Sequence, residues 1–104
     1  MALKTKNIKD LTRIQCLHPE GKKAPSIKAE TYALFEKAIR YGLRNKKTLT
    51  FSELTEEIEK YFAIHNTPFK GSIGWYAVIV KNHMESIGII MTFTEKGRKL
   101  HSLA

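Results

Sequence analysis

Residues 71–103 constrain the fold of this chain more than any other part of the sequence. Their apolar side chains first recur at helical spacing, and this pattern continues as far as Ile87. Ser72 stands where its hydroxyl can cap the N-terminus of the helix. Gly88 follows the last periodic residue, where the end of a helix favours a left-handed residue. The pattern therefore predicts a helix that stops sharply at Gly88.

A two-stranded hairpin is predicted directly after this helix. Residues 89–94 are rich in β-branched and aromatic side chains, which favour an extended strand. Residues 95–98 predict a turn, and residues 99–103 alternate like a returning strand. The basic residues at this tip are Lys96, Arg98 and Lys99.

Two further helices are predicted upstream. Residues 26–44 carry apolar side chains at three- and four-residue steps, which is typical of an amphipathic helix. Residues 48–51 predict a short strand, and Ser52 is then expected to cap a second helix over residues 53–62. The lysines of the preceding loop, residues 18–25, are interpreted as solvated, since no phosphate-binding signature accompanies them.

This order of elements is typical of a winged helix-turn-helix domain. We therefore predict an α+β fold, mainly α, with three helices, a small β-hairpin wing and a basic N-terminal arm. Residues 1–12 are expected to be a flexible basic leader, and residues 13–104 a single domain. Within that domain, residues 13–27 form the arm and residues 28–104 the core.

The phrases HPEGKKAPSI and GSIGWY…VKNHMESIGII resemble those of a small uncharacterised bacterial family with a winged-helix-like domain. The resemblance extends from about residue 13 to the end of the chain and implies the fold without implying an activity. Residues 84–90 also resemble the phrase that ends the third helix in many winged-helix regulators.

Net charge is the main guide to the class of partner. The chain has 18 Lys and Arg against 10 Asp and Glu, which gives a formal net charge of +8. Residues 1–28 account for +5, with seven basic and two acidic residues. Residues 48–62 carry −3, from Lys60 against four glutamates. A basic chain favours polyanionic partners, above all the nucleic acid backbone.

The sequence also indicates a location in the cell. No apolar run approaches the roughly 20 residues needed to cross a bilayer. The N-terminal residues lack the apolar core of a secretory signal. The single cysteine, Cys16, permits no internal disulfide, which fits a reducing compartment. We therefore expect a cytoplasmic protein with no membrane contact.

The predicted third helix is unusually apolar for one that reads DNA. If Met84 is in the core, Val80 and Ala77 share its face. Base-reading helices usually present polar side chains on the outer face. A helix that is apolar all round is normally covered all round, here by residues 13–27 or by a second subunit. The expected outward positions are Trp75, Tyr76, Ile79, Asn82 and His83.

No pattern in the sequence predicts catalysis. None of the four histidines lies three or four residues from another, and Cys16 has only His18 nearby as a second ligand. Cys16 is expected to be a buried small side chain rather than a nucleophile. We therefore predict no enzyme activity, no metal, no cofactor and no small-molecule substrate.

The leading prediction is a small nucleic-acid-binding protein that contacts DNA and has transcriptional regulation as a candidate role. Glutamates on the second helix oppose this prediction, because like charge weakens association with a polyanion. The candidate nucleic-acid-binding residues are Lys70, Tyr76, Lys81, His83, Lys96, Arg98 and Lys99.

The alternative prediction is a protein-interaction module that does not bind DNA. In this case the apolar face of the third helix is covered by a protein partner or by a second copy of the chain. The residues of that interface are Trp75, Tyr76 and Ile79. DNA binding predicts an exposed N-terminus of the third helix, whereas the interaction module predicts a buried one.

Overall fold

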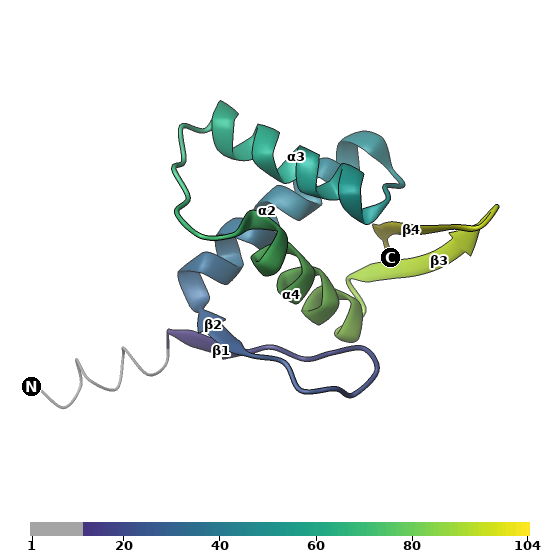
Figure 1. Cartoon of the computed structure of the whole chain (residues 1–104), viewed down its shortest axis with the longest axis horizontal. Coiled ribbons are helices and arrows are strands. Elements are labelled where there is room, and N and C mark those ends of the chain that lie inside the picture. Colours follow the sequence, from purple (N-terminus) through teal and green to yellow (C-terminus); the bar gives the residue numbers. More distant parts are fainter. Residues whose placement is uncertain (1–11) are drawn as a thin grey trace, which may run out of the picture.

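The computed structural model describes residues 12–104 of the chain. Within these residues it contains three helices and two small antiparallel hairpins, so the fold is α+β and mainly helical (Figure 1). The predicted leader, residues 1–12, lies outside the described residues except for Thr12. The elements in order are β1 (Arg13–Gln15), β2 (Ser26–Lys28), α2 (Ala29–Lys46), α3 (Phe51–Ile64), α4 (Ile73–Ser86), β3 (Ile90–Glu95) and β4 (Arg98–Leu103).

The start of α2 differs from the prediction. A helix was expected from Ser26, but Ser26–Lys28 forms β2, which pairs antiparallel with β1, and the helix begins only at Ala29. The reason is the burial of Ile27, which is 3% exposed because the strand turns it into the core. At the other end α2 continues through Lys46, and Lys47 has a positive φ of 63° that stops it.

Helices α2 and α3 lie very close together at Gly42. A Cβ atom placed on Gly42 would come within 2.9 Å of the Cβ of Glu57. The glycine is therefore in the helix interior because a larger residue would push α3 away. Glu57 is only 7% exposed, so this glutamate of α3 lies against α2 rather than in solvent.

The start of α3 also differs from the prediction. Thr50, rather than Ser52, caps this helix: its hydroxyl accepts a hydrogen bond from the backbone N–H of Glu53 at 3.2 Å. The Glu53 carboxylate accepts in return from the N–H of Thr50 at 2.9 Å, which completes a capping box. The short strand predicted at residues 48–51 is reduced to Leu49, which forms a single antiparallel bridge to His101.

The C-terminal part of the fold agrees with the prediction. The Ser72 hydroxyl caps α4 by accepting from the backbone N–H of Trp75 at 3.1 Å. The helix ends at Ser86, and Gly88 follows with a φ of 84°. Strands β3 and β4 pair from Ile90 with Leu103 out to Glu95 with Arg98. Lys96 and Gly97 form the turn between them with φ of 52° and 79°, as a tight hairpin requires.

The core lies between the three helices, and each of the two hairpins closes one of its ends (Figure 1). Cys16 of the N-terminal segment is 2% exposed, which confirms its prediction as a buried small side chain, and burial raises the pKa of its thiol. No helix among residues 12–104 is long and apolar enough to cross a bilayer. The side chains with the deepest burial include Phe35, Ala38, Ile39, Leu54, Ile58, Ala77, Val80 and Met84.

Candidate nucleic-acid interface

The four sides of helix α4 face different surroundings. These surroundings determine which α4 side chains are accessible to a partner. In Figure 1 it runs through the middle of the molecule, between the loop that joins β1 to β2 and the hairpin β3–β4. One side is the core side that the sequence predicts: Ala77, Val80 and Met84 are all 0% exposed. The other three sides face the N-terminal segment, hairpin β3–β4 and solvent.

The N-terminal segment covers the second side. The backbone N–H of Leu17 donates to Nδ1 of His83 at 2.9 Å, and the rings of Tyr32 and His83 meet edge to face at 5.3 Å. Ile79 lies one turn before His83 and is only 8% exposed, so the expectation that it points outward is wrong. Burial lowers the pKa of His83, which favours the neutral ring that can accept this hydrogen bond.

Tyr76 belongs to an aromatic cluster at the start of α4. Its ring stacks on Phe35 at a centroid distance of 5.6 Å and meets the edge of Phe69 at 5.2 Å. Trp75 contacts the outer side of this cluster, with its ring 4.9 Å from that of Tyr76. Trp75 itself is 49% exposed. Of the two neighbouring aromatic residues, therefore, Trp75 faces solvent and Tyr76 is partly buried.

Hairpin β3–β4 covers the third side of α4 around Lys81. This lysine is 6% exposed, and its Nζ lies 3.7 Å from Oε1 of Glu85. Burial lowers the pKa of Lys81, Glu85 opposes that change, and the nearby Lys99 adds to it. The Lys81 side chain is thus held at the junction between helix and hairpin, already paired with a carboxylate of its own helix.

His101 is the second buried polar group at this junction. It is 1% exposed, and Nδ1 of its ring lies 3.0 Å from the hydroxyl of Thr92 on the opposite strand. Burial, followed by the positive charge of Lys81, lowers the pKa of His101 to about 4. The ring is therefore neutral near pH 7. The backbone of His101 joins hairpin β3–β4 to the body of the protein through its bridge to Leu49.

The tip of hairpin β3–β4 presents exposed basic side chains. Lys96 and Lys99 are exposed, and neither forms an ion pair within residues 12–104. Arg98 is also exposed, but its guanidinium lies 3.8 Å from the carboxylate of Glu53 on α3. Lys70, just before the N-terminus of α4, is exposed as well. These four of the predicted residues remain accessible, whereas Lys81 is enclosed.

The loop between β1 and β2 adds basic side chains on the opposite flank of α4. Lys22 pairs with Glu20 at 3.2 Å, and Lys23 is exposed without an ion pair in the described part of the chain. Lys22 lowers the pKa of Glu20 most, through a hydrogen bond and its positive charge. Basic groups therefore flank α4 on two sides.

The fourth side of α4 is a narrow strip that faces solvent. It contains Trp75 and Val78, which are exposed, Val78 at 36%, and Asn82, which is half-buried. The side-chain amide of Asn82 forms no hydrogen bond with any other residue between 12 and 104, whereas its backbone carbonyl accepts from the Ser86 hydroxyl at 2.9 Å. The binding residues predicted from the sequence include neither Val78 nor Asn82, although their spacing from Trp75 places all three on one helical face.

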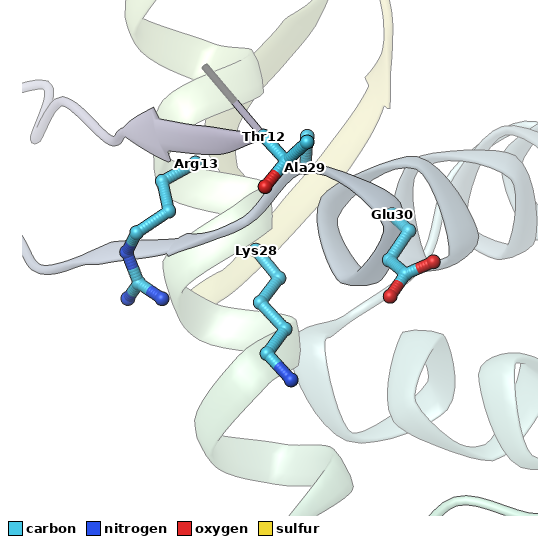
Figure 2. Close-up of a pocket in the computed structure, with 5 residues that line it drawn as sticks. All are labelled: Thr12, Arg13, Lys28, Ala29 and Glu30. Atoms are coloured by element: carbon cyan, nitrogen blue, oxygen red, sulfur yellow. The ribbon is translucent and has the colours of Figure 1, made fainter. Parts of the chain in front are cut away.

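The best-formed pocket of the described residues lies away from all of these residues. It has a volume of about 680 Å³ and is lined by Thr12, Arg13, Lys28, Ala29 and Glu30, where hairpin β1–β2 meets the start of α2 (Figure 2). Arg13 and Lys28 extend to the same side of the hairpin. The guanidinium of Arg13 donates to the carbonyl of Ser26 at 2.8 Å, so part of this lining is bound within the chain.

Neither this pocket nor a second one, near the end of α3, contains any residue predicted from the sequence to bind a partner. No three His, Cys, Asp or Glu side chains of the described chain lie close enough to hold a metal ion. The predicted binding residues instead lie along α4 and at the hairpin tip, on an open surface. That geometry suits a macromolecular partner better than an enclosed ligand.

The comparison with protein families identifies the chain. It belongs to a family of unknown function, DUF6958, whose model matches residues 13–100. The match includes both hairpins and all three helices, apart from the last residues of β4. No curated protein and no solved structure is significantly similar to the chain.

Proposed function

We propose that this protein is a winged helix-turn-helix protein that binds DNA, with transcriptional regulation as its role. In this proposal α4 is the recognition helix, which lies in the major groove, and hairpin β3–β4 is the wing, which contacts phosphates. The function is binding in the cytoplasm without catalysis or a cofactor. The observation that carries the proposal is the pair of exposed lysines, Lys96 and Lys99, which form no ion pair with any residue from 12 to 104 and lie on a hairpin that follows α4.

The order of elements supports the proposed fold class. A helix, a bridge residue, two further helices and a hairpin follow each other, and the bridge residue Leu49 pairs with β4. This pairing makes Leu49 a rudimentary third strand at the edge of the hairpin. The base of the hairpin is thereby held next to the end of α4, and Arg98 near its tip lies beside Glu53 of α3.

The charges of the accessible surface support a polyanionic partner. Lys70 precedes α4, Lys23 lies on one flank, and Lys96 and Lys99 lie on the other. Each lysine that neutralises a phosphate releases a counterion, which supplies affinity that does not depend on the DNA sequence. We therefore assign the backbone contacts to these four lysines.

The acidic second helix opposes DNA binding less than its composition suggests. Glu57 faces α2 and pairs with Lys60 at 3.4 Å, so its charge is both buried and compensated. Glu53 caps its own helix and lies beside Arg98. The exposed glutamates without an ion pair on α3, among the described residues, are thereby reduced to Glu56 and Glu59.

Three of the residues predicted from the sequence take other roles in this proposal. Lys81 is paired and enclosed, and Tyr76 packs into the aromatic cluster. His83 holds the N-terminal segment through the N–H of Leu17. These side chains shape and hold α4, whereas Trp75 and the lysines around it remain available for contact.

The test neutralises the tip without changing the fold. The variant Lys96→Gln with Lys99→Gln removes two charges from the hairpin and leaves the ion pair of Arg98 intact. The control is Lys37→Gln with Arg44→Gln, which removes two exposed charges from α2, a helix that passes behind α3 and α4 (Figure 1). Both variants have the same net charge, so any difference reports position rather than overall attraction.

We expect the tip variant to bind a DNA duplex more weakly. Its plot of log affinity against log salt should become shallower by about 1.8, from roughly 0.9 per lost phosphate contact. The control should keep most of the wild-type slope. Equal slopes for wild type, tip variant and control would contradict the assignment of hairpin β3–β4 to DNA.

The alternative function is a protein-interaction module, with a protein partner or a second copy of the chain as occupant. The apolar character of Trp75, which is 49% exposed, and Val78, which is 36% exposed, gives this alternative its basis, since apolar residues in one strip also suit a protein interface. Sedimentation of wild type and Trp75→Ser separates the cases. A dimer that Trp75→Ser dissociates, together with no affinity for duplex at low salt, would favour the module.

A further inference from the structure

We infer that the solvent-facing strip of α4, formed by Trp75, Val78 and Asn82, selects A·T base pairs in the major groove. The inference rests on the proposed function and adds the class of DNA sequence that the site prefers. Its basis is the chemistry of Trp75 and Val78, which are exposed, and of Asn82, which is half-buried.

The spacing of the strip fits consecutive base pairs. Trp75, Val78 and Asn82 are separated by three and four residues, which places them on one face of α4. At about 1.5 Å per residue the strip rises about 10 Å along the helix axis. Base pairs in B-DNA are about 3.4 Å apart, so the strip matches roughly three base-pair steps.

Val78 and Asn82 carry the groups that recognise thymine and adenine. The methyl groups of Val78 are exposed and can contact the C5-methyl group of thymine. The amide of Asn82 can accept from N6–H of adenine and donate to N7, which is the usual bidentate pairing of asparagine with adenine. Within residues 12–104 that amide has no competing hydrogen bond, so both of its ends are available.

The strip lacks the groups that recognise guanine. The commonest specific contact with guanine is a bidentate one from arginine or lysine. The only basic residue of α4 besides His83 is Lys81, which is 6% exposed and paired with Glu85. The exposed lysines on the flanks lie at the hairpin tip and in the β1–β2 loop, where phosphate contacts are expected. The strip therefore favours A·T pairs for two reasons: it can contact thymine and adenine, and it lacks the arginine or lysine that would contact guanine.

The charges around the strip make DNA its occupant rather than a protein. Lys23 lies on one flank and Lys96 and Lys99 on the other, all without an ion pair in the described residues. An apolar strip with a free amide between two basic flanks complements the major groove, where methyl groups and base edges lie between two phosphate backbones. A protein partner remains an outcome of the test.

The experiment compares three duplexes of equal length with the full chain at low salt. The first is rich in A·T pairs, the second has uracil in place of every thymine, and the third is rich in G·C pairs. We expect the thymine duplex to bind tightest. The uracil duplex should bind about four-fold more weakly for one lost methyl contact, since a buried methylene is worth about 0.8 kcal/mol. The G·C duplex should bind roughly ten-fold or more weakly.

A matched pair of variants assigns the discrimination to the strip. Asn82→Ala should reduce the preference for A·T over G·C, while affinity for the G·C duplex stays within about two-fold of wild type. Asn45→Ala removes an exposed asparagine at the end of α2 and should leave the preference unchanged. Val78→Ala should remove the difference between the thymine and uracil duplexes.

The outcomes separate this inference from the proposed function. Salt-sensitive binding of equal strength to all three duplexes overturns the inference and leaves DNA binding in place. Equal loss of discrimination in Asn82→Ala and Asn45→Ala also overturns it. If none of the duplexes binds at low salt, both proposals fail and the strip is left to a protein partner.

Discussion

Hairpin β1–β2 pairs three residues in each strand and joins them through a long loop, whereas β3–β4 pairs six residues in each strand across a two-residue turn. The short hairpin places Ile27 and the neighbouring Cys16 in the core. The long hairpin buries only its base, at Ile90, Leu100 and His101, and leaves its tip in solvent. The loop of the first hairpin contacts α4 through Leu17 and His83, and β3 of the second follows directly after the end of α4.

The difference shows how two similar motifs divide the surface of one helix. The first hairpin and its loop remove the Ile79 and His83 side of α4 from solvent. The second encloses Lys81 at its base and presents the exposed Lys96 and Lys99 to solvent. Hairpin β1–β2 with its loop therefore covers part of α4, whereas hairpin β3–β4 carries exposed charge. The two roles can be tested separately.

The largest expected effect on stability comes from a substitution in hairpin β1–β2. Ile27→Ala should lower the free energy of unfolding by about 2–4 kcal/mol, because it leaves a cavity where a fully buried side chain was. The control Ile87→Ala removes the same atoms from a side chain that is 49% exposed. That control should cost less than about 1 kcal/mol in urea denaturation. Similar losses for the two variants would mean that hairpin β1–β2 is not part of the core.

A pH dependence is expected at the base of hairpin β3–β4. The pKa of His101 is about 4 in the folded chain, below its unfolded value of about 6.5. The unfolded chain therefore takes up the proton first as pH falls. The contribution of His101 to stability is complete above about pH 6.5 and is lost as pH falls to about 4, by at most about 1.4 kcal/mol per pH unit.

Urea denaturation between pH 7 and pH 4.5 measures this dependence. His101→Gln should flatten the loss of stability over this range, because glutamine does not titrate. The exposed His65→Gln is the control and should keep the wild-type dependence. An unchanged pH dependence in His101→Gln would show that the histidine is not buried in its neutral form.

A smaller effect on stability is expected at the contact between the loop of hairpin β1–β2 and α4. His83→Ala removes the acceptor for the N–H of Leu17 and should cost about 1 kcal/mol. Hydrogen exchange at the Leu17 amide should become faster, while Asn82→Ala, one residue earlier, should leave that amide unchanged. Full protection of the Leu17 amide in His83→Ala would place its hydrogen bond elsewhere.

The smallest effect on stability is expected at the hairpin tip. The double variant Lys96→Gln with Lys99→Gln should change the free energy of unfolding by less than about 0.5 kcal/mol, because both side chains are exposed and unpaired among the described residues. Thermal unfolding measures this value. A loss of more than about 1 kcal/mol would mean that the tip stabilises the fold and is not simply exposed charge.

The sequence predicts the C-terminal part of the fold well because its signals are local. Ser72 stands at the cap, Gly88 after the last turn of α4, and the hairpin turn at Lys96 and Gly97. The N-terminal hairpin is formed by three pairs between residues far apart in the chain. The same residues that read as the start of a helix, Ser26–Lys28, are drawn into β2 by burial of Ile27.

The candidate site is less predictable, because exposure on α4 is decided by what packs against it. The helical period correctly assigns Ala77, Val80 and Met84 to the core. It cannot say that Ile79 is buried, that His83 accepts a hydrogen bond from Leu17, 66 residues earlier in the chain, or that Lys81 is enclosed. Those facts depend on tertiary packing, and they leave Trp75 and Val78 exposed and Asn82 half-buried.

The most direct test of the account is the fluorescence of Trp75, the single tryptophan, as the full chain is titrated with a DNA duplex at low and at moderate salt. The account predicts emission typical of a partly exposed indole, which changes on addition of duplex. The affinity should fall by about 0.9 log units per log unit of salt for each phosphate contact. Emission that is unchanged by duplex at both salt concentrations would contradict it and direct the search to a protein partner.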